Sequence, residues 1–376
     1  MNELASYSIQ AITFAVIAML AISRSKKADF YQLFLISAWL VGVIVIYARY
    51  GEGQVLFYSN DQDFHKLIIE HYIPLEGISL NAFWGLRYTL TVPVYLVSTI
   101  GIDAMLLLKF VQLAFLLLLY RQAKLFLSAQ GIKIKIWHLS CIAGPITIFM
   151  SLLALRDLIL AFCAVAFVLN TSIRFRLIVL LLALSLRPHL AVALAFGFGV
   201  SELFDRLKNK KTLYGVFTVS IFSYIIGCLA FPIGAYLQHN AAFEGPSSVF
   251  SQLKFFRLVI NFVGLQFLAL DDENGLIVAQ STITLLISRL VFFDTILIPV
   301  LFLRTVFMRI TYLTKYKMLV LQSFLFFYGV VSQTTWNSTR QNIPFLACMG
   351  VLAVADLERL QKMKQKIKPA LQFAAR

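Results

Sequence analysis

The sequence predicts an all-α polytopic membrane protein with about 11 transmembrane helices, its N-terminus outside the cell and its C-terminus in the cytoplasm. Two observations lead there: 60% of the 376 residues are hydrophobic and only 14% are charged. A soluble domain has about 45–50% apolar and about 25% charged residues, because its surface must be solvated. The apolar runs are also continuous rather than alternating, which favours helices that cross the hydrocarbon over strands.

Eleven apolar runs make up the predicted spans. They cover 8–23, 30–48, 104–120, 137–154, 158–173, 177–187, 190–204, 213–236, 279–303, 318–333 and 342–356. The four cysteines, Cys141, Cys163, Cys228 and Cys348, fall inside these runs, so we expect small apolar side chains rather than disulfides or metal ligands. Residues 1–356 then form a single transmembrane domain.

The net charge of +15 arises from short basic loops rather than from a nucleic-acid-binding surface. Most Lys and Arg residues cluster within 24–27, 121–135, 174–176, 206–211, 304–317 and 359–376. All six clusters reach the same side of the bilayer only with eleven spans, the N-terminus out and the C-terminus in. Residues 357–376 are then a basic cytoplasmic tail, suited to anionic headgroups.

Two long loops, 49–103 and 237–278, face outside in this topology. Each holds an apolar stretch, 88–101 and 253–270, that is interrupted by Pro93 or by polar residues such as Arg257. If either stretch crossed the bilayer, the later basic loops would be reversed. We therefore expect amphipathic or re-entrant segments there.

Two predicted hairpins are too short for a bilayer and carry charges at their turns. Arg156 and Asp157 join 137–154 to 158–173, and Arg187 and His189 join 177–187 to 190–204. Eleven residues from Arg176 to Arg187 make roughly 16 Å of helix, against a hydrocarbon core of about 30 Å. Arg187 should therefore lie below the outer surface and face protein or a water-filled cavity.

Plainer interpretations of these charges stay open. Arg156 and Asp157 can cap a tight turn or pair locally, and Arg187 can reach up to lipid phosphates. The functional interpretation is an outward-facing cavity in which Arg side chains bind an anion, because a guanidinium makes bidentate contacts with phosphate.

The first outer loop adds acidic residues in the stretch YSNDQDFHKLIIEHY. Asp61 and Asp63 have the D-x-D spacing that can hold a divalent cation on a diphosphate, although solvated loop Asp pairs are equally ordinary. A single Asp, or His65, can instead act as a base toward a sugar hydroxyl. Arg87, Arg257 and Arg340 also lie on this side, with Trp336, for which an interfacial belt is the simpler interpretation.

The absent motifs restrict the function. No Walker A, GxGxxG or HExxH pattern occurs, which argues against an ATP-driven pump, a dinucleotide enzyme or a zinc protease. Asp103, Lys109 and Asp294 are the few charges at doubtful depth, so an intramembrane ion relay has little to work with.

The layout resembles the Wzy and EpsG type of polysaccharide polymerases and, more broadly, the GT-C class of membrane glycosyltransferases. The matching residues are Pro145, Ser151, Arg156 and Asp157, then Arg187-Pro188-His189, then Arg340 before the last span. Two features depart from the GT-C pattern: the D-x-D follows the second span rather than the first, and there is no large periplasmic domain. The resemblance covers most of the chain as a layout.

This resemblance implies a glycosyltransferase of the bacterial inner membrane that uses a polyprenyl-diphosphate-linked saccharide on the extracytoplasmic face. Arg156, Arg187 and Arg340 would bind the diphosphate. Asp61 or Asp63 would be the base, with His65 and His189 as second candidates. Arg87, Asp157, Arg257 and Trp336 would orient the substrates. Other polysaccharide-assembly proteins would be partners. No cofactor is expected, because three arginines already offer charge for a diphosphate, and a divalent cation at Asp61 and Asp63 stays open as the alternative.

Two rivals remain. A transporter or flippase of lipid-linked saccharides would also need an outer cationic cavity, but it should show structural repeats and charges on both sides. A membrane acyltransferase would need a His paired with an acid, for which His189 and Asp157 are the candidates.

Overall fold

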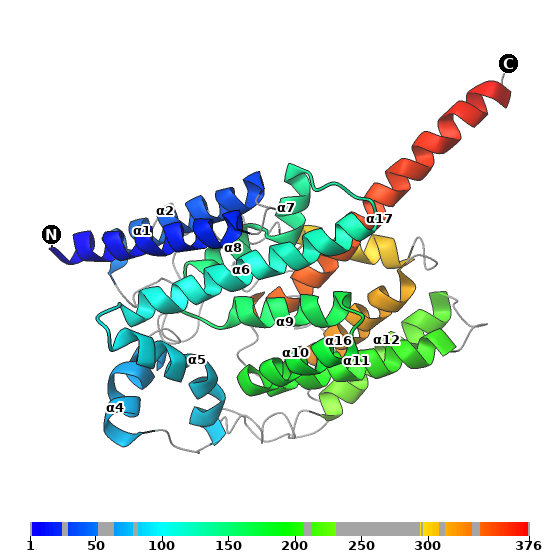
Figure 1. The fold of residues 1–376 in the computed structure, drawn as a ribbon. Coiled ribbons are helices and arrows are strands. Elements are labelled where there is room, and N and C mark those ends of the chain that lie inside the picture. Colours follow the sequence, from blue (N-terminus) through cyan, green and yellow to red (C-terminus); the bar gives the residue numbers. More distant parts are fainter. Residues whose placement is uncertain are drawn as a thin grey trace.

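The computed structural model describes residues 2–24, 29–51, 64–77, 82–206, 213–230, 294, 296–307, 313–332 and 339–374, and every element in these ranges is helical (Figure 1). The elements are α1 (Asn2–Ser23), α2 (Phe30–Tyr50), the π-helix η1 (Ile68–Tyr72), α4 (Ile73–Glu76), α5 (Ala82–Ser98), α6 (Ala104–Ala129), α7 (Ile136–Ile142), α8 (Pro145–Ser151), α9 (Asp157–Leu169), α10 (Ile173–Leu186), α11 (Pro188–Arg206), α12 (Leu213–Leu229), α16 (Thr314–Ser332) and α17 (Thr339–Ala374). The helical fold class is confirmed.

Three described helices are long and apolar enough to cross a bilayer: Glu3–Ser23, Phe30–Arg49 and Ala104–Ala129. Shorter apolar helices cover Tyr88–Ser98, Asp157–Leu169, Gly215–Leu229 and Ile296–Phe307. Large apolar side chains are exposed along several helices, among them Ile9 on α1, Val41 on α2 and Leu181 on α10. Apolar surface of this extent fits a lipid environment rather than water.

The start of α2 is tied to the far end of α6. Asp29 caps α2 by accepting a hydrogen bond from the backbone N–H of Gln32 at 3.0 Å. The same carboxylate accepts from the Tyr120 hydroxyl at 2.9 Å and the Lys124 ammonium at 2.6 Å. One acidic side chain therefore closes a helix end and joins the α1–α2 hairpin to α6.

Several of the described helices pack around α9, whose residues are almost all buried. On α9 lie α6, α10 and α17, while α16 packs between α11 and α12. Lys317 of α16 is 2% exposed, pairs with Asp356 of α17 and donates to the carbonyl oxygen of Thr305 at 3.1 Å. Buried charges of this kind are retained when they are paired.

The segment expected to form one span over 137–154 is instead two short helices. α7 ends at Ile142, and α8 begins at Pro145 after Ala143 and Gly144. Pro145 lacks a backbone N–H and disfavours helical geometry at the residue before it, so a helix starts there rather than continues. This region does not form the single span that its hydropathy predicts.

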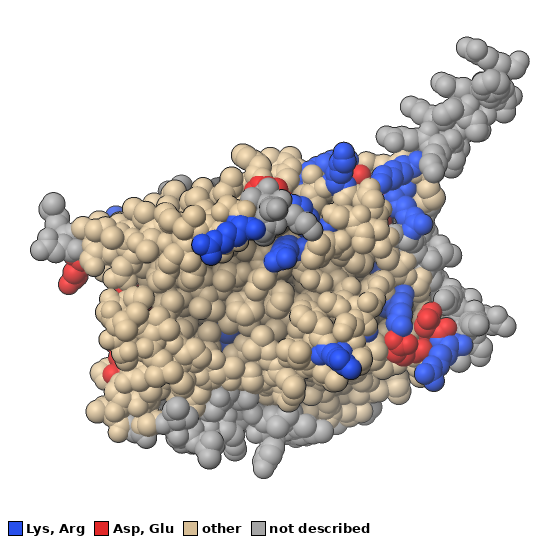
Figure 2. All heavy atoms as spheres, viewed as in Figure 1, with Lys and Arg blue, Asp and Glu red and all other residues tan. Residues whose placement is uncertain are grey.

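The last predicted span and the basic tail form one helix. α17 contains 36 residues and leaves the bundle as a continuous rod (Figure 1). On the face shown in Figure 2, Lys and Arg gather toward the end from which α17 emerges, and the opposite half is mostly uncharged.

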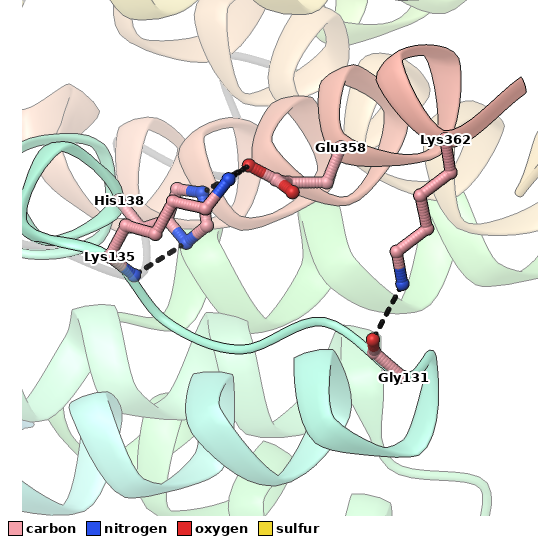
Figure 3. Close-up of polar contacts among 5 residues, drawn as sticks. All are labelled: Gly131, Lys135, His138, Glu358 and Lys362. Atoms are coloured by element: carbon pink, nitrogen blue, oxygen red, sulfur yellow. Dashed lines mark hydrogen bonds and ion pairs between the residues drawn. The ribbon is translucent and has the colours of Figure 1, made fainter. Parts of the chain in front are cut away.

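Where α17 emerges, it is joined to the loop after α6 (Figure 3). The backbone N–H of Lys135 donates to Nδ1 of His138 at 3.0 Å, so Nε2 carries the proton and donates to Glu358 at 3.1 Å. Nζ of Lys135 lies 2.6 Å from the same carboxylate oxygen, and Nζ of Lys362 donates to the Gly131 carbonyl at 2.6 Å. Gly131 has a φ of +69°, which glycine adopts without strain.

We expect Glu358→Gln to loosen this junction. Burial raises the pKa of Glu358, but hydrogen bonds from Lys135 and His138 prevail and lower it below the ordinary value of 4.5. The carboxylate therefore stabilises the folded state fully above its unfolded-state pKa. This stabilisation disappears as the pH falls through the lower folded-state pKa. At neutral pH the free energy of unfolding of the variant should be about 1–2 kcal/mol lower than that of wild type. This difference should disappear in acid.

Glu202→Gln is the control for this experiment. Its pair with Lys315 is partly exposed on both sides, so its loss should change thermal stability by less than about 1 kcal/mol. If the two variants lost the same free energy of unfolding in detergent, Glu358 would not hold α17 more strongly than an exposed ion pair does.

We also expect Gly350→Ala to destabilise the bundle. A Cβ atom at Gly350 of α17 would overlap the backbone carbonyl of Cys141 in α7, so the two helices would have to separate. The cost should be about 1–3 kcal/mol, as for other overpacked sites. In contrast, Gly199→Ala in α11 meets nothing within 4 Å and should be neutral or stabilising by up to about 1 kcal/mol. Thermal unfolding of both variants compares these outcomes; a Gly350→Ala variant as stable as Gly199→Ala would exclude the close helix contact.

Candidate functional site

The two short hairpins meet through Asp157 and Arg187. Asp157 is the first residue of α9 and Arg187 is the C-cap of α10, and their side chains are 1% and 3% exposed. Nη2 of Arg187 lies 3.9 Å from Oδ1 of Asp157. This distance exceeds a direct hydrogen bond, so the two side chains form a buried ion pair at the long end of the range. The expected burial of Arg187 within protein is confirmed.

The sequence of α10 explains why Arg187 points inward. Arg176, Val179, Ala183 and Leu186 form its buried face, while Leu177, Leu181 and Leu184 are exposed. Eleven residues are close to three helical turns, so Arg187 emerges on the same side as Arg176. The following Pro188 begins α11 and redirects the chain.

Arg156 connects the two hairpins in a second way. It lies at the N-cap of α9 and is half-buried, and its Nη1 donates to the carbonyl oxygen of Leu186 at 2.5 Å. That carbonyl is at the end of α10, where helices leave acceptors without intrahelical donors. Arg156 therefore has a structural role in joining the two turns.

The segment that begins at Phe64 reaches the same turn. Nδ1 of His65, which is 3% exposed, lies 2.9 Å from the carbonyl oxygen of Ala154, two residues before Arg156. His65 precedes the π-helix η1, an uncommon form that often occurs at functional sites. The structure thus brings His65 to the turn that holds Arg156.

Two further residues hold the junction and were not identified from the sequence. Gln112 of α6 is fully buried, and its Oε1 accepts from the backbone N–H of Leu158 at 3.1 Å. Nε1 of Trp39 lies 3.2 Å from the carbonyl of Lys109 and 3.0 Å from that of Ser151, at the end of α8. Polar groups inside otherwise apolar spans are the signal that marks both residues.

Lys109 and His189 complete the neighbourhood. Lys109 is 1% exposed, and its Nζ donates to the Tyr7 hydroxyl at 3.1 Å. His189, at the start of α11, packs its ring against Phe327 of α16 with the centroids 5.2 Å apart. The ring is thus held by an aromatic contact next to Arg187.

The other predicted site residues are not placed in this way. Arg340 lies in the first turn of α17, which packs along α9, and Arg87 lies in α5, but their side chains are outside the described residues. Asp61, Asp63, Arg257 and Trp336 lie wholly outside them. Among the residues that the structure describes, no group of three or more His, Cys, Asp or Glu side chains could hold a metal ion.

The described site is therefore a buried junction where two Arg side chains, one carboxylate and two His rings come from three separate segments. Such a set can bind an anion through guanidinium groups and can move a proton through carboxylate or imidazole. Comparison of the chain with protein-family models, curated proteins and solved structures gives no match.

We expect His65→Ala to release the segment 64–77 from the hairpin turn. Loss of one buried hydrogen bond costs about 1 kcal/mol, which corresponds to roughly five-fold faster local opening. Hydrogen–deuterium exchange of peptides from this segment measures the effect. The control is His71→Ala, because His71 is exposed on η1. Equal exchange in the two variants would show that the His65 contact does not hold the segment.

Proposed function

We propose that this protein is an integral-membrane glycosyltransferase that uses a polyprenyl-diphosphate-linked saccharide on the extracytoplasmic side of the bacterial inner membrane. One observation carries the proposal: Arg156, Asp157 and Arg187 meet at the junction of two short helical hairpins, with His65 held against the same turn.

The depth of the junction favours a lipid-linked substrate. α9 has 13 residues and α10 has 14, which correspond to roughly 20 Å of helix each. The hydrocarbon core is about 30 Å thick. If the turn between α9 and α10 lies at the cytoplasmic surface, the charged junction at their other ends lies below the outer surface, within reach of a phosphate attached to a membrane-embedded chain.

The charges fit the chemistry of glycosyl transfer. The acceptor hydroxyl oxygen attacks the anomeric carbon as the bond from that carbon to the diphosphate oxygen breaks. The hydroxyl proton goes to a carboxylate or an imidazole, for which Asp61, Asp63, His65 and His189 are the candidates. The diphosphate leaves with added negative charge, which guanidinium groups such as those of Arg187, Arg156 and Arg340 would stabilise.

Other substrate-side roles belong to the same proposal. Arg87, Asp157, Arg257 and Trp336 would orient the donor or the acceptor. Asp157 also keeps the Arg187 guanidinium in place through their 3.9 Å pair. A buried Arg next to a carboxylate is fixed in position before the substrate arrives, which reduces the cost of reorganisation.

The activity test compares Arg187→Gln and Arg187→Lys, with turnover of lipid-linked oligosaccharide from the source cells as the readout. Gln should lower turnover by about 10²–10³-fold, and Lys should restore part of it because its ammonium lacks the planar fork. Monodisperse gel filtration must show that each variant is folded.

Arg176→Lys is the matched control. Arg176 is a buried Arg on the same helix, and its Nε donates to the Phe167 carbonyl at 2.9 Å, away from the junction. Its turnover should stay within a few-fold of wild type. Near-normal turnover of folded Arg187→Gln would reduce Arg187 to a structural partner of Asp157 and remove the basis of the proposal.

The proposed orientation is tested with single cysteines in a variant that lacks the four native ones, all of which are buried. A membrane-impermeant thiol reagent added outside intact cells should label position 75 on α4, where Leu75 is 80% exposed. It should not label position 121 near the far end of α6. Outside labelling at 121 would reverse the topology and the side on which the reaction is proposed.

A further inference from the structure

An open pocket of about 420 Å³ lies at the N-terminal end of α6. Its polar lining comes from Glu70 on η1, Tyr95 and Ser98 on α5, Thr99, and Asp103 before α6. None of these residues belongs to the arginine junction. The volume is within the usual range of small-molecule sites.

The walls of this pocket are fixed by packing and capping. Ile68 of η1, Ile73 of α4 and Tyr88 of α5 form a separate small core that joins the two walls. On the third side, Oδ1 of Asp103 caps α6 through the backbone N–H of Leu106 at 2.6 Å, and the Asp103 backbone N–H donates to Oε1 of Gln10 at 2.9 Å. The pocket is therefore formed by three anchored elements.

The lining selects the chemistry of a ligand. Glu70 and Asp103 offer carboxylate oxygens, which accept hydrogen bonds and disfavour anions. Nζ of Lys66 lies 3.9 Å from Oε1 of Glu70 and offsets part of that charge, so Asp103 is the carboxylate without this lysine beside it. The hydroxyls of Ser98 and Thr99 donate to the carbonyls of Tyr95 and Leu96 at 2.8 Å and 2.7 Å, which leaves their oxygens as acceptors. A ligand for this pocket should be rich in hydroxyl donors, carry no negative charge and offer an apolar face to Tyr95. A neutral saccharide has all three properties.

The pocket lies outward of the arginine junction along α6. Gln112, whose side chain contacts the start of α9, follows Asp103 by nine residues, or roughly 14 Å of helix. On the pocket's other wall, Glu70 follows His65 by five residues, and His65 contacts the hairpin turn. Residues 65–70 thus join the arginine junction inside the bundle to the pocket at the N-terminal end of α6.

We propose that this pocket binds the neutral acceptor saccharide, an assignment that rests on the proposed glycosyl transfer for the word acceptor but not for the binding itself. The donor diphosphate would occupy the cationic junction, and the acceptor chain would pass along η1 from the pocket toward it. The two sites differ in charge, so each excludes the other's ligand.

The test uses full-length protein in nanodiscs and a diazirine derivative of chitotriose, a neutral N-acetylglucosamine trimer, at millimolar concentration. Sialyllactose with the same diazirine is the anionic comparison. Mass spectrometry should map the chitotriose adducts to peptides 64–77 and 88–106, and excess unlabelled chitotriose should suppress them. Labelling by sialyllactose should be at least five-fold weaker.

Two variants and two controls make the result specific. Ser98→Trp fills the pocket and should lower labelling at least ten-fold, and Glu70→Gln should lower it about three-fold. Ser172→Trp, on the exposed loop before α10, and Glu3→Gln, in the exposed first turn of α1, should leave it unchanged. No adducts on these peptides, or labelling of Ser98→Trp as strong as that of wild type, would overturn the pocket assignment.

Failure of the pocket and failure of the proposed function are separable in the same preparations. Native mass spectrometry of bound polyprenyl diphosphate reports on the arginine junction: Ser98→Trp should keep this lipid, and Arg187→Gln should lose it while keeping chitotriose labelling. Chitotriose labelling with normal turnover of Arg187→Gln would leave the pocket in place and remove the transferase. Binding of polyprenyl diphosphate without chitotriose adducts on the pocket peptides would leave the proposed transferase in place and remove the pocket assignment.

Discussion

The structure depends on one constraint, which is that two of its central helices are shorter than the bilayer and still end in charged residues. α9 and α10 have 13 and 14 residues, and their ends bring Asp157 and Arg187 together inside the bundle. An unpaired charge buried inside the bundle would cost several kcal/mol. The opposite charges of Asp157 and Arg187 offset that cost within the protein. Gln112 and Arg156 hold the two helix ends in place through the Leu158 N–H and the Leu186 carbonyl.

The rest of the bundle supports this junction from several sides. Trp39 of α2 lies within hydrogen-bond distance of the end of α8, His65 contacts the turn that follows, and α17 packs along α9. At the other end of the bundle, Glu358 holds α17 to the loop that precedes α7. Because α17 contacts both regions, its placement connects the basic end of the protein with the buried site.

The sequence was sufficient for the helical class, for the break at Pro188 and for the burial of Arg187, because helix length and the energy of a charge in hydrocarbon are local arguments. It was insufficient for α7 and α8, where hydropathy suggested one span and the Gly144–Pro145 step interrupts it. It also missed the roles of Trp39 and Gln112, since each depends on a carbonyl or N–H from a distant helix. The π-helix η1 has no sequence signal that we can identify. Asp61 and Asp63 stay predictions, as do the span count and the topology.

The central claim is that the Asp157–Arg187 junction binds a lipid diphosphate rather than serving only as a buried ion pair. The most direct measurement is an experimental structure of the full chain in nanodiscs with a polyprenyl diphosphate added. The account predicts density for the diphosphate within hydrogen-bond distance of the Arg187 guanidinium, with its lipid chain leaving the bundle toward the bilayer. A diphosphate bound elsewhere, with Arg187 and Asp157 in direct contact and closed off by neighbouring side chains, would contradict it.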